Sequence, residues 1–98
     1  MRDPLVLEEV KSTLALLTER APGRAIEVRI PPYAAVQCGD GPTHTRGTPP
    51  NVIEMNAETW LAIASGERSW ADAMSAGLIS ASGVRADLTE LLPLEVKQ

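Results

Sequence analysis

Residues 56–83 hold two tryptophans on two short helical patterns that follow each other closely and lead into a strand-like sequence. Asn56 is a favoured helix N-cap, and Trp60 and Ile63 lie three positions apart, on one helical face. Gly66 can adopt the left-handed conformation that ends a helix. Tryptophans in such positions commonly anchor helices on a sheet, so this region predicts two helices packed on strands.

The second of these helices begins almost at once. Ser69 and Asp72 form a pair that resembles a capping box, and Gly77 can close the helix. The spacing predicts an inner side made of Trp70, Ala73, Met74 and Gly77. A strand is expected over residues 78–82.

The first third of the chain predicts one long helix. Asp3 followed by Pro4 is an N-cap with a first-turn proline, and Pro22-Gly23 ends the segment. Between them, apolar residues recur at helical spacing: Leu7, Val10, Leu14 and Leu17. This face should pack against the strands that follow.

Residues 25–30 switch to period two, with Ile26, Val28 and Ile30 on one face and charged residues on the other. Residues 33–38 and 52–55 read as further strands, and residues 39–51 as turns around a short extended piece at 43–46. A final helix is expected to turn Val84, Leu88, Leu91 and Leu92 inward and to end at Pro93. The pattern predicts an α+β fold.

Length and charge restrict the classes of function. Ninety-eight residues predict a single domain over 1–98 with little volume to spare for a cavity. The net charge of −4, without a basic run, argues against nucleic acid as a partner and against anchoring to anionic headgroups. No signal peptide and no apolar run long enough for stable membrane insertion is seen, so a cytoplasmic location is expected.

The sequence offers little for chemistry. Cys38 is the single cysteine, and the simplest interpretation is a small buried residue in a strand. One histidine and scattered carboxylates are too few ligands for a metal site, and no credible catalytic triad exists. We therefore expect no catalytic residues, no metal and no cofactor, and we expect the chain not to be an enzyme.

His44 and Arg46 form the best candidate for a polar site. They lie two positions apart between glycines and prolines, so an extended backbone would point both side chains at one ligand. Arg46 would bind a carboxylate or another anionic headgroup through two parallel hydrogen bonds, with His44 as a second donor. The other interpretation is an exposed loop in which Arg46 pairs with Glu54 or Asp40.

Two segments carry a resemblance to a known family: HTRGTPPNVIEM and TWLAIASGERSWADAMSAGLISASGVRADL. They resemble the sterol-carrier-protein-2 (SCP2)-like family, and more specifically the short actinobacterial sterol carrier family proteins, the bacterial SCP orthologues. They are also similar to the C-terminal domain of mycothiol-dependent maleylpyruvate isomerases. The resemblance implies an SCP2-like fold, with one mostly antiparallel sheet of four to five strands and helices packed on one face.

The resemblance also implies a function. Members hold a fatty acyl chain, acyl-CoA or sterol in an apolar tunnel between sheet and helices, without catalysis. Here the tunnel would be walled by Val52, Met55, Trp60, Ile63, Trp70, Met74, Leu78, Leu88, Leu91 and Leu92. The same residues also fit a filled hydrophobic core, because periodicity does not separate a core from a tunnel. The second hypothesis is an accessory module that binds a partner enzyme, and a homodimer also stays open.

Overall fold

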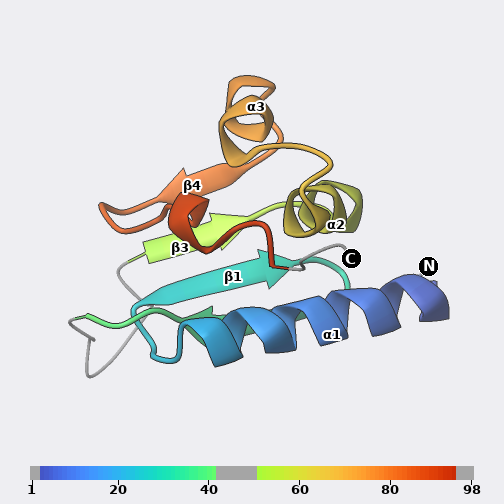
Figure 1. The fold of residues 1–98 in the computed structure, drawn as a ribbon, viewed down its shortest axis with the longest axis horizontal. Coiled ribbons are helices and arrows are strands. Elements are labelled where there is room, and N and C mark those ends of the chain that lie inside the picture. The colour runs from blue at the N-terminus through green and yellow to red at the C-terminus, as the bar shows by residue number, and fades with distance from the viewer. Residues whose placement is uncertain (1–2, 42–50, 95–98) are drawn as a thin grey trace.

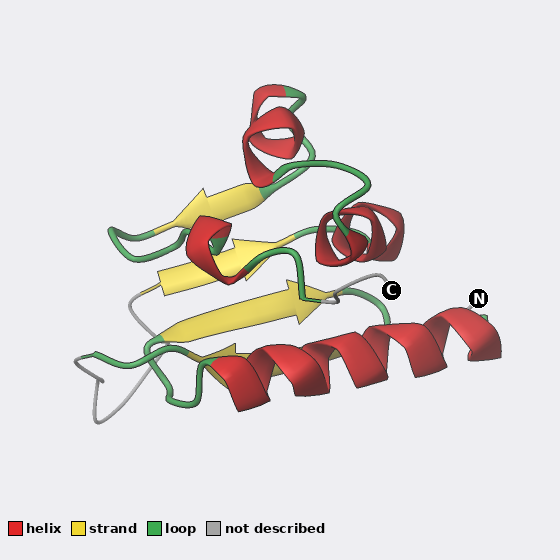
Figure 2. Ribbon diagram, in the orientation of Figure 1, coloured by secondary structure: helices red, strands yellow, loops and turns green. Residues whose placement is uncertain are grey.

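The computed structural model describes residues 3–41 and 51–94, and in this part of the chain four strands form one sheet with helices against one face (Figure 1). The helices are α1 (Pro4–Arg20), α2 (Ala57–Ser65) and α3 (Trp70–Ser75), followed by a 3₁₀ turn, η1 (Thr89–Leu91). The strands are β1 (Ile26–Ile30), β2 (Ala34–Cys38), β3 (Asn51–Glu54) and β4 (Ser80–Ser82). Figure 2 shows the same arrangement by element type. The predicted α+β class is confirmed.

The sheet is mixed. Among the described strands the order is β2-β1-β3-β4, with antiparallel β1–β2 and β3–β4 pairs and a parallel β1–β3 pair. The hairpin explains the parallel pair: β2 returns the chain to the start of β1, where Cys38 lies opposite Ile26. On the other side of β1, Asn51 also lies opposite Ile26, so β3 starts beside the start of β1 and runs parallel to it.

The two faces of the sheet differ as the period-two pattern predicts. Val28 and Ile30 are completely buried on the helix side. On the other face Arg29 Nε lies 2.8 Å from a carboxylate oxygen of Glu27, and its Nη1 lies 3.9 Å from one of Glu54. Antiparallel and mixed sheets often leave one face to solvent, and charged side chains suit that face.

The predicted helix caps are confirmed. The side chains of Asp3, Asn56 and Ser69 each accept a hydrogen bond from a backbone N–H group in the first turn of the helix that follows. Gly66 ends α2 in the left-handed conformation, with φ of 88°. Local sequence chemistry alone fixes these boundaries, because each cap needs only groups within a few residues.

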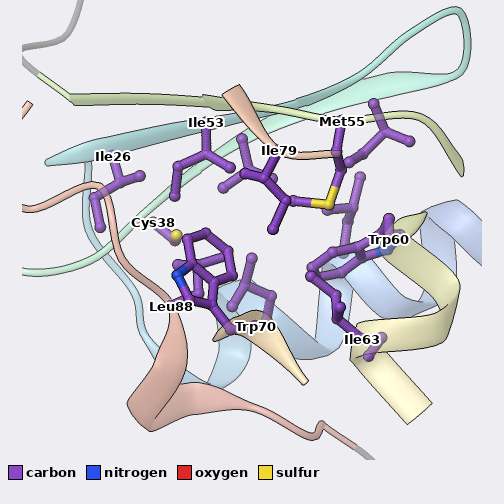
Figure 3. Packing of buried hydrophobic residues seen from close by; sticks show 14 of the residues in the cluster. Ile26, Cys38, Ile53, Met55, Trp60, Ile63, Trp70, Ile79 and Leu88 are labelled. Carbon is purple, nitrogen blue, oxygen red and sulfur yellow. The ribbon is translucent and has the colours of Figure 1, made fainter. Parts of the chain in front are cut away.

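The core fills the layer between sheet and helices. The buried face of α1 consists of Val10, Thr13, Leu14 and Leu17. Trp60 has no exposed surface, and its indole Nε1 donates a hydrogen bond of 2.7 Å to Thr13 Oγ1, so the one polar atom of the indole is satisfied. Figure 3 shows Trp60 and Trp70 pointing into one layer with Ile53, Ile79 and Met55.

The predicted final helix is wrong. After Gly83 the chain turns, Val84 is completely exposed rather than inward, and η1 is the one helical turn described in this segment. The Asp87 carboxylate accepts hydrogen bonds from the backbone N–H and the hydroxyl of Thr89. Such local bonds compete with the helical pattern, and they lower the pKa of Asp87 from its ordinary value. Pro93 has no backbone N–H to donate, so a helix could not continue past it.

The predicted inner side of the second Trp-bearing helix is also partly wrong. Trp70 and Ala73 are buried, but Met74 keeps 41% of its surface exposed. With only six residues, α3 makes less than two turns. Trp70 and Ala73, three positions apart, face the core, and Met74, the next residue, faces solvent.

Candidate ligand site

Half of the residues predicted to wall a tunnel lie together in the buried core. They are Met55, Trp60, Ile63, Trp70 and Leu88, and none of them is more than 8% exposed. Figure 3 shows these side chains in one layer beneath the strands. Side chains of the protein itself occupy this layer, so a ligand there has to displace some of them.

The other half do not join this cluster. Val52 pairs with Glu27 in β1 and Ser82 in β4, on the face of the sheet that points away from the helices. Since Ile53 is the buried residue of β3, the two-residue period of the strand places Val52 on the opposite side. Met74 and Leu78 are 41% and 38% exposed. Leu91 and Leu92 are partly buried and pack against the edge of the core.

The core is closed by the segment 83–94, which we call the cover segment. Its inward side chains are Ala86, Leu88 and Leu94, and Leu88 has no exposed surface. Apart from η1 it has no regular secondary structure, and in Figure 1 it passes in front of β3. A segment with few internal backbone hydrogen bonds depends on its anchors for its position.

The end of the cover segment is held by one arginine. The Arg20 guanidinium, at the end of α1, donates hydrogen bonds to the carbonyl oxygens of Leu91 at 2.8 Å, Pro93 at 2.9 Å and Leu94 at 3.0 Å. The Leu94 N–H in turn donates to the carbonyl of Ala64 in α2 at 2.8 Å. The guanidinium reaches the three acceptors from two nitrogens of one rigid plane, a geometry that the single nitrogen of a lysine does not reproduce.

Replacing Arg20 by alanine is expected to raise the hydrogen-exchange rate of the Leu94 amide by about tenfold, because hydrogen bonds to a charged donor are lost from a segment with few other anchors. Exchange at the core amide of Val28 should change much less. Arg24→Ala is the matched control, since Arg24 makes one side-chain bond, to Gln37 at 3.3 Å. Equal acceleration at Leu94 and Val28 would show that Arg20 stabilises the whole fold rather than the cover segment.

The start of the cover segment is held by Asn51. Its side-chain Nδ2 donates to the carbonyl of Ala25 at 2.9 Å, and its Oδ1 accepts from the N–H of Arg85 at 2.9 Å. The residue is 2% exposed; its bond to Ala25 is buried and its bond to Arg85 is partly buried. Asn51 thus joins the start of β1 to the turn after β4.

A hollow of about 640 Å³ opens beside the cover segment. Its lining residues are Ala21, Ile26, Gly39, Asp40, Arg85, Asp87, Thr89, Glu90 and Leu91. Ile26 and Leu91 connect it to the core, while Arg85 lies at its rim and donates to the carbonyl of Asp40 at 3.4 Å. Here, among the described residues, apolar side chains reach the surface beside one cation, Arg85, and three carboxylates, Asp40, Asp87 and Glu90.

The remaining candidates for chemistry are few. Cys38 is buried in β2, and this burial raises the pKa of the thiol to about 11, so it stays protonated and unreactive at neutral pH. His44 and Arg46 lie outside the described residues. Within residues 3–41 and 51–94, no group of three or more potential metal ligands comes together. In the same ranges no helix has both the length and the apolarity needed to cross a bilayer.

Three polar residues with structural roles were not recognised in the sequence. Thr13 reads as a break in the apolar stripe of α1, yet it receives the indole hydrogen bond. Asn51 stands at the end of a predicted loop, and its two partners are 26 and 34 positions away. Arg20 was recognisable only as a basic residue in the last turn of a helix, where it also suits the helix dipole.

Among known protein families, the one described as bacterial SCP ortholog matches the chain over residues 3–94. No curated protein matches it significantly. The family match covers every helix and strand described above, from the Asp3 cap to the end of the cover segment. The resemblance to the C-terminal domain of maleylpyruvate isomerases stays a prediction.

Proposed function

Since the chain belongs to the family of bacterial SCP orthologs, we propose that it is a non-enzymatic, cytoplasmic carrier that holds an apolar or acyl ligand between its sheet and its helices. The ligand class is a fatty acyl chain, an acyl-CoA or a sterol-like molecule. The family match supports the carrier role. The way the core is covered supports a ligand position between the sheet and the helices.

The observation that carries the proposal is the nature of the cover. Leu88 belongs to the same buried cluster as Trp70, but it lies in a segment whose described part makes one helical turn and is held at its two ends by Arg20 and Asn51. If the cover segment lifts, Ala86, Leu88 and Leu94 leave the layer together, and part of an acyl chain can take their place. Each buried methylene contributes about 0.8 kcal/mol, which offsets part of the lost contacts of these side chains.

The polar end of the ligand would lie beside Arg85, the one cation among the described residues that line this hollow, where Asp40, Asp87 and Glu90 also line the wall. Gly41, the last described residue before the segment 42–50, lies against this side chain: a Cβ atom at Gly41 would be 3.0 Å from the guanidinium carbon. His44 and Arg46 follow three and five positions later in the sequence. We propose the headgroup role for His44 and Arg46, with Arg85 as a further cation.

The first experiment is native mass spectrometry of freshly purified protein, followed by organic extraction of anything bound. A stoichiometric adduct of acyl or isoprenoid mass is expected. Binding of a fluorescent fatty acid to delipidated protein then measures affinity, and loss of that affinity in Arg46→Ala, but not for the matched fatty alcohol, tests the headgroup role.

The site itself is tested at Leu91, which lines the hollow and is only partly buried. Leu91→Trp is expected to weaken binding of the fluorescent fatty acid by about tenfold, because the larger ring narrows the opening while the fold tolerates it. Leu5→Trp is the control, since Leu5 is 77% exposed and lies at the start of α1, whereas the hollow lies beyond the end of this helix, at Ala21. A wild-type protein that is purified without ligand and does not bind the probe would contradict the carrier function, and equal binding by both variants would contradict this site.

One observation favours a second function. Trp60, Trp70 and Leu88 are packed in the layer that a tunnel would need, and a domain with a filled core can act as an accessory module for a partner enzyme or a second copy of itself. An apo mass together with no binding of the probe would favour this function over the carrier.

A further inference from the structure

The surface between α1 and α2 contains a hollow that the carrier function does not use. This α1–α2 groove has a volume of about 690 Å³, a size in the range of specific ligand sites. Its lining residues are Val6, Glu9, Ser12, Thr13, Tyr33, Ala57, Glu58, Leu61, Ala62, Ala64, Ser65 and Glu67. Aliphatic side chains from both helices therefore form part of its wall. Thr13 also lines the groove, and its Oγ1 accepts the hydrogen bond of the buried Trp60 indole.

The charged residues of the groove all have one sign. Glu9, Glu58 and Glu67 line it, and no lysine, arginine or histidine is among the described residues that do. In the described part of the chain, the ion pairs are those of Arg29 and involve none of the three. Arg68 lines a neighbouring hollow, which Glu58 and Glu67 also line. Three carboxylates with one arginine nearby leave the groove negative, so a positively charged partner is attracted to it.

Exposed leucines extend the apolar surface beyond the groove. Leu5 is 77% exposed and Leu16 is 39% exposed. They fall on the same edge of α1 as Glu9 and Ser12, at positions i, i+4, i+7 and i+11. The two leucines are separated by about 16 Å along the helix, which is longer than a headgroup and matches a short peptide segment.

We propose that the α1–α2 groove binds a basic amphipathic segment of a partner protein. An aliphatic side chain of the segment packs on Val6 and Leu61, and its lysines or arginines face the three carboxylates. Charge complementarity determines the sign of the partner, and the leucine spacing determines that it is a peptide rather than a small cation. The inference does not depend on whether the core holds a ligand.

The probe is a synthetic amphipathic peptide of leucine and lysine, about twelve residues long, titrated into ¹⁵N-labelled full-length protein. We expect backbone signals of α1 and α2 to shift. We also expect the indole N–H signal of Trp60 to shift and that of Trp70 to stay, because only the Trp60 indole bonds to a residue of the groove. A scrambled peptide of the same composition and a leucine-glutamate peptide are the controls.

Charge reversal separates the groove from the general negative charge of the protein. Glu9→Lys with Glu58→Lys is expected to raise the Kd of the peptide at least about tenfold. The matched pair Glu8→Lys with Glu19→Lys changes the net charge equally, at exposed residues of α1 that do not line the groove, and should change the Kd less than about twofold. Circular dichroism confirms that both double variants fold.

Three results would overturn the proposal: no binding of the peptide at millimolar concentration, equal weakening by both pairs, or equal affinity for the scrambled peptide. A shift of the Trp70 indole without that of Trp60 would also overturn it, since it would place the peptide elsewhere. Binding of the fluorescent fatty acid should be unchanged in Glu9→Lys with Glu58→Lys, so failure here and failure of the carrier function give different results.

Discussion

Replacing Trp60 by alanine is expected to lower the free energy of unfolding by about 3 to 5 kcal/mol, as is usual for a large aromatic side chain removed from a core. The indole has no exposed surface and contributes its hydrogen bond to Thr13, so the substitution leaves both a cavity and a hydroxyl without its donor. Small domains have about 5 to 15 kcal/mol of stability in total, so this variant should be close to unfolding. Urea denaturation followed by circular dichroism measures the loss.

Two further variants separate packing from hydrogen bonding. Trp60→Phe keeps most of the apolar volume and removes the donor, and Thr13→Val removes the acceptor. A double-mutant cycle between them should give a coupling of about 1 kcal/mol, the usual net contribution of such a bond. Leu5→Ala, at a residue that is 77% exposed, should change stability by less than about 0.5 kcal/mol. A loss below about 1 kcal/mol in Trp60→Ala would contradict the packing described here.

Gly23→Ala adds a single methyl group but is expected to lower the free energy of unfolding strongly. Gly23 has a φ of 139°, and a Cβ atom there would lie 1.9 Å from the carbonyl oxygen of Gly39, so the backbone has to move. That oxygen also accepts a hydrogen bond from the Ala25 N–H at the start of β1. The backbone conformation costs about 1 to 2 kcal/mol and the forced displacement about 1 to 3 kcal/mol more.

Gly77→Ala is the matched control. Gly77 has a φ of 74°, and a Cβ atom at this position would meet nothing within 4 Å. The substitution should therefore show the conformational cost alone, about 1 to 2 kcal/mol. Thermal unfolding of the two variants gives the comparison, and equal losses would mean that the contact between Gly23 and Gly39 relaxes without cost.

Local structure was largely predictable from the sequence. The Asp3, Asn56 and Ser69 caps and the left-handed Gly66 need only neighbours within a few residues, and all four occur as predicted. The alternation in β1 likewise fixed which face is buried. Where a competing local bond was overlooked, at Asp87 and Thr89, the predicted final helix was wrong.

The candidate site was predictable only in part. The apolar pattern found Trp60, Trp70 and Leu88, but the same pattern included Met74 and Val52, which the structure turns to solvent and to the opposite face of the sheet. Periodicity selects apolar residues and their local face. It contains no information on how far a short helix such as α3 extends or on which side of a neighbouring strand a residue falls.

The sequence by itself determined the family, the α+β class, the helix starts and the inward residues of β1, because propensity, caps and short periods act within a few residues. Tertiary structure alone decided what closes the core. Arg20 reaches carbonyls more than 70 positions away, and Asn51 joins residues 25 and 85. The packing of α1 on α2 also brings Glu9 to the same groove as Glu58 and Glu67. Contacts of this range depend on how the packed layers bring distant segments together, and no local pattern records that.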